Sequence, residues 1–293
     1  MSSLHTKRAA AAGLAGALAL GTIASVGALS PAAAAEGTTT YNCTLSISPA
    51  PVPMEITGSA ALPSSVQSGQ SLAGFPVTMG VALPATLVQS ISTLLPGLAS
   101  IGGSTEPLEM PFGGAGSLMT GPVSIPQTAP TGTGALILAG TGKTAAGTAP
   151  APGVYDVLMP KSFTFNPVGN STIVGEQALP SFPCSTAAPA KLGTVTVTKA
   201  TSKVVTKVTN APVTPAKRAK VRVTVRSTAT NAGKVLIKKG KTVLAKGTLS
   251  DADRKTLVLP KLKRGTHKLV AIYKGDANTK ASKKAFDLVV KRG

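Results

Sequence analysis

The chain has 293 residues and a formal net charge of +20 at pH 7, and its length suits two globular domains. It contains no tryptophan, three tyrosines and two histidines. This composition argues against aromatic sugar-binding platforms, base stacking and histidine-based catalysis.

The N-terminal segment has the pattern of a secretory signal. Lys7 and Arg8 form a short positive region, residues 9–29 form a weakly apolar run without charge, and small residues precede Glu36. This pattern predicts a signal peptide over residues 1–35 and a secreted, extracellular or cell-wall-associated protein.

The alternative for the same run is a transmembrane anchor, because about 20 apolar residues can span a bilayer. Its many glycines and alanines make it poorly hydrophobic, and no later segment is long and apolar enough to span. Residues 289–293 carry no hydrophobic tail and no wall-sorting motif. We therefore expect no transmembrane segment in the mature chain and no covalent attachment to the wall.

The charge changes sign after Cys184. Residues 36–185 hold two lysines against six carboxylates, a net of −4, whereas residues 186–293 hold 26 lysines and arginines against four aspartates, a net of +22. We predict an acidic domain at 36–185, a short linker at 186–192 and a basic domain at 193–293.

The acidic domain is predicted to be a β-sandwich with one short helix. Its strands are short and separated by Gly and Pro. Between Pro84 and Pro96, apolar residues from Leu87 to Leu95 fall on one helical face. The expected strands cover residues 38–48, 56–62, 75–83, 117–125, 134–140, 155–160 and 162–166.

The two cysteines, Cys43 and Cys184, lie near the two ends of the acidic domain. An even pair in an exported chain predicts a disulfide that ties the first strand to the last. Two free thiols are the alternative. A metal site is not expected, because the histidine that remains after signal removal, His267, lies in the other domain.

The basic domain alternates apolar and polar residues over seven short segments, with turn signals such as Lys239-Gly240 and Arg264-Gly265 between them. This spacing predicts an immunoglobulin-like sandwich, so the whole mature chain is expected to be all-β. The expected strands contain residues 195–197, 221–225, 235–237, 243–244, 257–259, 269–273 and 286–290.

The run Gly-Thr-His-Lys-Leu-Val-Ala-Ile-Tyr-Lys-Gly-Asp at 265–276 resembles a signature of bacterial Ig-like repeat domains, over roughly residues 193–292. The resemblance implies an extracellular setting and no activity. It also implies that Tyr273 packs inward and that Gly275 and Asp276 open the last hairpin.

The acidic domain more loosely resembles an uncharacterised domain of secreted actinobacterial proteins. The shared features are the opening Tyr41-Asn42-Cys43, a short helix in mid-domain and a second cysteine near the end. The function of that domain is unknown, so this resemblance implies architecture alone.

Enzyme motifs are absent from the sequence, and we expect no enzymatic activity, cofactor or metal site. There is no G-x-S-x-G elbow and no H-E-x-x-H, and His267 is expected on the solvent side of its strand. Glycoside hydrolysis needs only two carboxylates, so Glu106, Glu109 and Asp156 remain candidates for a hydrolase or sugar-binding site.

Nine cations are expected to gather at the end of the Ig-like domain away from the acidic domain. Cations crowded within a Debye length of about 8–10 Å attract polyanions. No aromatic residues lie among them, so nucleic acid is not the expected partner. The candidate anion-binding residues are Lys217, Arg218, Lys220, Lys238, Lys239, Lys241, Lys261, Lys263 and Arg264.

These patterns favour a secreted, non-enzymatic envelope protein whose basic domain is a spacer or an electrostatic anchor to anionic wall polymers or lipid headgroups. The alternative interpretation of the cations is a face that only keeps the protein soluble. Two further hypotheses remain open: a carbohydrate-binding accessory or hydrolase with its site in the acidic domain, and an adhesin that binds a protein partner through its sheet edges.

Overall fold

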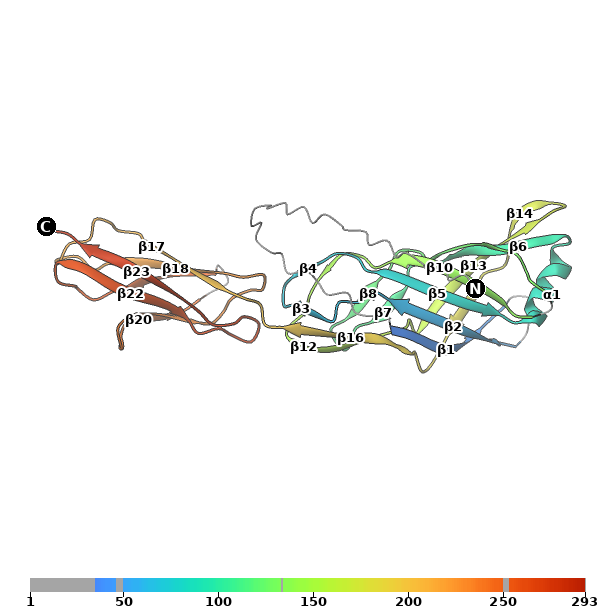
Figure 1. Ribbon diagram of the computed structural model, residues 1–293, viewed down its shortest axis with the longest axis horizontal. Helices are drawn as coiled ribbons and strands as arrows, with labels where there is room; N and C mark the ends of the chain where they lie inside the picture. The colour runs from blue at the N-terminus through green and yellow to red at the C-terminus, as the bar shows by residue number, and fades with distance from the viewer. Residues whose placement is uncertain (1–34, 46–49, 133, 250–252, 293) are drawn as a thin grey trace, which may run out of the picture.

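A computed structural model describes residues 35–45, 50–132, 134–249 and 253–292. Residues 1–34 of the predicted signal peptide and Asp251 lie outside these ranges. Two β-rich modules follow each other along the long axis of the molecule (Figure 1), with the C-terminus at one extremity and helix α1 (Ala85–Leu94) at the other. No helix among the described residues is long and apolar enough to cross a membrane.

The main sheet of the first module closes on itself in a barrel-like form. Every pairing in it is antiparallel, and β13 completes the circuit because it pairs with both β15 and β6. In spatial order the strands are β13 (Ser162–Ser171), β15 (Phe182–Ser185), β1 (Ala35–Cys43), β2 (Val52–Ala60), β5 (Pro76–Leu83), β10 (Leu136–Lys143), β9 (Ser124–Thr128) and β6 (Leu98–Thr105).

Short strands surround this sheet. The additional strand β14 (Gly175–Ala178) pairs with the second half of β13. The smaller sheets pair β4 (Ser71–Leu72) with β11 (Gly147–Thr148), β7 (Glu109–Pro111) with β8 (Ser117–Met119), and β16 (Lys191–Thr198) with both β12 (Gly153–Leu158) and β3 (Ser65–Gln67).

Alternate residues of the closed sheet fill its interior. Tyr41, Ile56 and Leu138 are each fully buried, as period-two strands with one apolar face require. The expected helix is confirmed, and Leu87, Val88 and Ile91 form its buried face. The described part of the chain is therefore all-β with one short helix, and the main sheet of its first module is closed.

The second module is the predicted Ig-like sandwich. One sheet orders β17, β18 and β21, and the other orders β20, β19, β22 and β23. The valines of β18 and the Leu269, Ala271 and Tyr273 face of β22 are buried between them. The strands are β17 (Lys203–Val208), β18 (Lys220–Arg226), β19 (Lys234–Lys239), β20 (Thr242–Thr248), β21 (Arg254–Val258), β22 (Gly265–Tyr273) and β23 (Ser282–Val290).

One strand belongs to a different module from the one expected. Val195 and Val197 were assigned to the Ig-like domain, but their strand, β16, pairs with β12 and β3, and both side chains lie in the core of the first module. Alternation predicts which side chains are buried and not which sheet receives them. The first Ig-like strand is β17, so the chain leaves the first module about ten residues later than predicted.

Close contacts join the two modules. The Thr201 backbone N–H donates to Gln67 Oε1 at 2.9 Å, and Thr228 Oγ1 donates to the Ser68 carbonyl at 2.9 Å. Ala200, which is fully buried, bridges to the loop between β22 and β23. The loops that follow β18 and β22 therefore face the first module, and the turns at the opposite ends of these strands point away from it.

Candidate functional site

Three turns and the last strand meet at the far end of the Ig-like module. Val213, in the turn between β17 and β18, bridges to Val290 at the end of β23. The Leu259 N–H, in the turn after β21, donates to the Ala219 carbonyl at 2.8 Å. These contacts bring segments that are far apart in the sequence to one end of the sandwich.

All nine predicted cations lie in these turns or at the strand ends beside them, and we call the set the distal cluster. Eight of the side chains are exposed and Lys238 is half-buried. The connecting segments 209–219, 240–241 and 259–264 contain no Asp or Glu. Lys291 and Arg292, which were not among the predicted cations, follow β23 at the same end and are exposed.

His267 is placed differently from the prediction. It is 7% exposed and lies on the inner face of β22, the face of Leu269 and Ala271, because positions two apart on a strand share a side. Its Nε2 lies 2.8 Å from the Lys263 carbonyl and its Nδ1 lies 3.1 Å from Lys239 Nζ. A carbonyl only accepts and an ammonium only donates, so Nε2–H donates and Nδ1 accepts.

This geometry gives His267 a structural role. The ring connects the end of β19 to the turn before β22, and it holds Lys239 and the Lys263 backbone beside each other. Two members of the distal cluster are thus positioned by one buried side chain. The sequence signal for this was present, since residues 267, 269, 271 and 273 have the same parity.

Asp276, in the loop between β22 and β23, is engaged away from the distal cluster. The Asp276 carboxylate accepts hydrogen bonds from the Ala232, Asn278 and Thr279 N–H groups and from Tyr273 Oη, all at 2.7–2.8 Å. Burial raises the pKa of Asp276, but these four hydrogen bonds together hold it below its usual value. The implied roles of Tyr273 and Asp276 in the last hairpin are confirmed.

A second cationic area lies on the outer face of the sheet formed by β17, β18 and β21. Lys203 is directly opposite Arg226, and Lys207 is directly opposite Arg222. The alternation of β18 is visible in the sequence, but no strand was expected at β17, so these pairs were not predicted. We call this set the sheet face; its members are Lys203, Lys207, Lys220, Arg222, Arg226 and Arg254.

The structure brings together two of the three candidate carboxylates in the first module. Glu106 and Glu109 line the same open hollow of about 500 Å³, and Glu109 accepts a hydrogen bond of 2.7 Å from Ser117 Oγ. Asp156 does not line that hollow. It forms a 2.7 Å ion pair with Lys191 and accepts from Thr194, and these hydrogen bonds lower its pKa.

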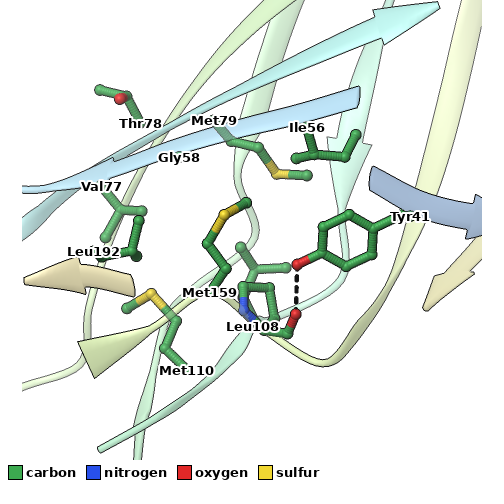
Figure 2. A pocket seen from close by; sticks show the side chains of 11 residues that line it. Tyr41, Ile56, Gly58, Val77, Thr78, Met79, Leu108, Met110, Met159 and Leu192 are labelled. Carbon is green, nitrogen blue, oxygen red and sulfur yellow. Dashed lines mark hydrogen bonds between the residues drawn. The ribbon is translucent and has the colours of Figure 1, made fainter. Parts of the chain in front are cut away.

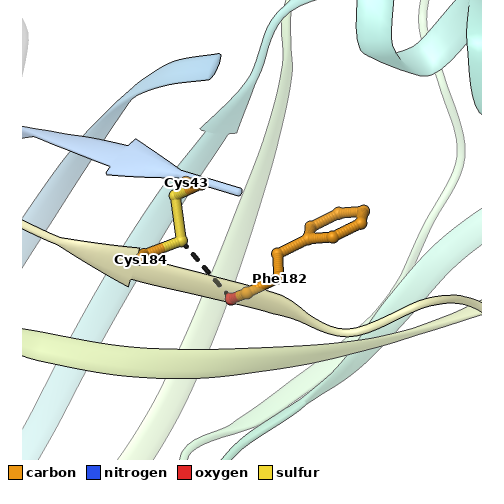
Figure 3. Close-up of a disulfide and its surroundings, with 3 residues drawn as sticks. All are labelled: Cys43, Phe182 and Cys184. Atoms are coloured by element: carbon orange, nitrogen blue, oxygen red, sulfur yellow. Dashed lines mark hydrogen bonds between the residues drawn. A yellow bond between two sulfur atoms is a disulfide. The ribbon is translucent and has the colours of Figure 1, made fainter. Parts of the chain in front are cut away.

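The predicted disulfide is confirmed. Cys43 on β1 and Cys184 on β15 are register partners, with an S–S distance of 1.98 Å and a sequence separation of 141 (Figure 3). Both cysteines are buried. The bond therefore joins the two ends of the first module across neighbouring strands.

A small cavity lies in the interior of the first module. Figure 2 shows a cavity between Met79, Met110 and Met159, beside Tyr41, whose hydroxyl donates to the Pro160 carbonyl. Its volume is about 20 Å³, room for about one water molecule. Within the described part of the chain, no three His, Cys, Asp or Glu residues are grouped so that they could hold a metal ion.

Two family models match the chain. A family of unknown function (DUF6801) matches residues 40–193, which is more than half of the sequence. The chain belongs to the DUF6801 family. A bacterial Ig-like domain (group 3) matches residues 205–291 and follows the DUF6801 domain, in agreement with the position of β17. No curated protein matches the chain at a significant level.

Solved structures with a similar arrangement are distant. A protein of Corynebacterium diphtheriae described as membrane-anchored is 12% identical, with a TM-score of 0.37, over 88% of this chain and 59% of that one. Fibronectin(III)-like modules of Clostridium thermocellum CbhA are 14% identical, with a TM-score of 0.26, over 80% and 94%. A Ruminococcus gnavus beta-glucuronidase is 9% identical, with a TM-score of 0.25, over 87% and 44%. These likenesses are too distant to support a functional argument.

Proposed function

We propose that the protein is a secreted, non-enzymatic component of the cell envelope, held by electrostatic attraction between its Ig-like module and anionic wall polymers or surfaces. The observation that carries the proposal is the distal cluster, in which nine cations share one end of the sandwich and the connecting segments 209–219, 240–241 and 259–264 contain no carboxylate. The DUF6801 module would then lie at the end of the protein away from the wall polymer.

The charges at the distal cluster are available for a partner. Among the residues that the structure describes, the one ion pair within 4 Å joins Lys191 to Asp156, both in the first module. Each Lys or Arg close to an anionic surface contributes about 1 kcal/mol of attraction, so several together retain a protein at low salt. Lysines outnumber arginines in this cluster, which suits diffuse attraction more than bidentate recognition.

Salt elution from isolated cell walls tests the proposal. The purified full chain is added to walls at low ionic strength and eluted with steps of NaCl. We expect release by about 0.5 M NaCl, because the Debye length is then well below 8 Å. Retention at 1 M NaCl, or no binding at low salt, would contradict an electrostatic attachment.

A second candidate function is a sugar-binding or hydrolytic site in the DUF6801 module. The observation that favours it is the hollow shared by Glu106 and Glu109. A glycan array and hydrolysis assays test it with Glu106→Ala and Glu109→Ala, and Asp156→Ala provides a matched carboxylate outside the hollow. Loss of binding or turnover in the first two variants alone would support this function, and no signal from the wild type would end it.

A further inference from the structure

The sheet face concentrates six cations on one side of three strands. All six side chains are exposed, and β17, β18 and β21 contain no Asp or Glu. The nearest carboxylate in the sequence, that of Asp253, accepts hydrogen bonds from the backbone and side-chain amides of Asn231. The positive charge of the sheet face is therefore not balanced by any acidic side chain on β17, β18 or β21.

The register of the strands makes this arrangement unfavourable without a partner. Lys203 faces Arg226, and Lys207 faces Arg222, in directly opposed positions. Directly opposed residues have Cβ atoms about 4.5–5.5 Å apart, and like charges at this distance destabilise a sheet. An anion lying over the pairs would remove that repulsion.

The outer face of the other sheet is different. There Lys268 faces Asp287, and Ile272 faces Lys283, so neither lysine of these two pairs is directly opposite another cation. Leu236 and Ile272 are register partners on the same face. The high net charge is thus not spread evenly, and this second face provides a matched control.

The geometry favours an extended ligand with regularly repeated charges. Lys220, Arg222 and Arg226 occupy alternate positions of β18, so successive outward positions are about 6.7 Å apart, and neighbouring strands are about 4.8 Å apart. The strands run along the long axis of the molecule (Figure 1). A polymer chain lying lengthwise would contact the whole face, whereas a flat membrane touching the distal end would not.

The residue types favour phosphate. Half of the sheet face is arginine, whose planar guanidinium forms bidentate hydrogen bonds with phosphate oxygens. Thr224 and Thr256 lie beside Arg254 and Arg222 in the register and offer hydroxyl groups. No aromatic side chain lies on these strands to stack a base or a sugar ring.

We infer that the sheet face is a binding surface for a linear phosphate polymer that lies along the strands. The inference rests on the proposed function and deepens it, because it assigns the main contact to the side of the Ig-like module and gives the distal cluster a supporting part. Arginines fixed on strands would then determine the class of ligand.

Three triple variants of the full chain test this assignment, with long-chain inorganic polyphosphate as the probe. Each variant loses three positive charges. The sheet-face variant carries Lys207→Gln, Arg222→Gln and Arg226→Gln. The distal variant carries Lys217→Gln, Lys241→Gln and Lys261→Gln. The control variant carries Lys234→Gln, Lys246→Gln and Lys283→Gln on the other outer face.

We expect the sheet-face variant to bind polyphosphate about a hundredfold more weakly and the control variant less than about fivefold. The slope of log K against log salt should fall by about 2 in the sheet-face variant, since each lost phosphate contact on a single strand removes about 0.7. Its melting temperature should equal or exceed that of the wild type, because like-charge pairs have been removed. This result separates loss of binding from loss of folding.

The inference would be overturned if all three variants lost affinity equally, or if the distal variant lost most of it. It would also be overturned if vesicles containing phosphatidylglycerol, and not polyphosphate, distinguished the sheet-face variant from the control. In each of these cases wall retention at low salt would leave the proposed function standing. A wild-type chain that bound neither walls, vesicles nor polyphosphate would refute both.

Discussion

Replacement of Asp276 by alanine should destabilise the Ig-like module. Four donors lose one acceptor, and Tyr273, whose hydroxyl donates to this carboxylate, is fully buried and cannot turn to water. Hydrogen bonds to charged groups contribute about 1.5–3 kcal/mol each but are not additive, and the loop donors can be hydrated. We expect a loss of about 3 kcal/mol in the free energy of unfolding, or about 15 °C in melting temperature.

The isosteric Asp276→Asn variant separates charge from shape. Its oxygen can still accept from Asn278 and Thr279, but its amide group then meets the Ala232 N–H as donor against donor. We expect a loss of about 2 kcal/mol. Asp287→Asn, an exposed aspartate on β23, is the matched control and should change stability by less than about 0.5 kcal/mol.

The pH dependence has a definite sign. The folded pKa of Asp276 lies below its ordinary value, because its hydrogen bonds outweigh the effect of burial. Its contribution is therefore present above the unfolded pKa of about 3.9 and is lost as the pH falls toward the folded pKa. Wild-type stability should decrease below about pH 4 more steeply than that of Asp276→Asn.

Calorimetry, with hydrogen exchange of the peptide 265–273 to assign the transition, measures these effects. The reasoning would be refuted if Asp276→Ala cost no more than Asp287→Asn, or if the acid limbs of wild type and Asp276→Asn had the same slope.

Three further results are expected. Replacing both Cys43 and Cys184 by alanine should lower the stability of the DUF6801 module by about 2–5 kcal/mol, seen as a lower calorimetric transition, and an unchanged transition under oxidising conditions would contradict this. His267→Ala should cost about 1–3 kcal/mol and speed hydrogen exchange in the turn before β22, and protection equal to wild type would rule out the structural role. Gly69 has a φ of +70°, and a Cβ atom at this position would lie only 2.3 Å from the Thr228 carbonyl oxygen, so the site cannot accept a side chain. Gly69→Ala should therefore loosen the junction of the modules. An unchanged small-angle scattering profile would refute this expectation.

The sequence predicted the features that depend on local periodicity. Helix α1 and the buried valines of β18 follow from spacing alone, because burial on one face fixes the period. The inward position of Tyr273 was implied by the resemblance to bacterial Ig-like repeat domains. The disulfide followed from the number of cysteines and the predicted compartment. These features need no knowledge of which strands are neighbours.

The features that were missed depend on strand pairing. Residues 98–105 contain two glycines and two serines and resemble a loop, yet they form β6, which closes the sheet with β13. Val195 and Val197 alternate as any half-buried strand does, and only pairing with β12 assigns them to the first module. The sheet face was hidden for the same reason, since its opposed cations come from two strands.

Charge distribution, more than total charge, is what the fold adds to the sequence. The aspartates could have neutralised the cations, but Asp253 and Asp276 are used by buried or backbone donors at the junction, and Asp287 faces Lys268 on the other sheet. The described aspartates thus lie at the junction and on the outer face of the other sheet, where Lys234, Lys246 and Lys283 keep some positive charge, and none of them lies in the distal cluster or on the sheet face. This placement of the acids leaves two adjoining surfaces, the distal cluster and the sheet face, where a polyanion would meet no acidic side chain of the described residues.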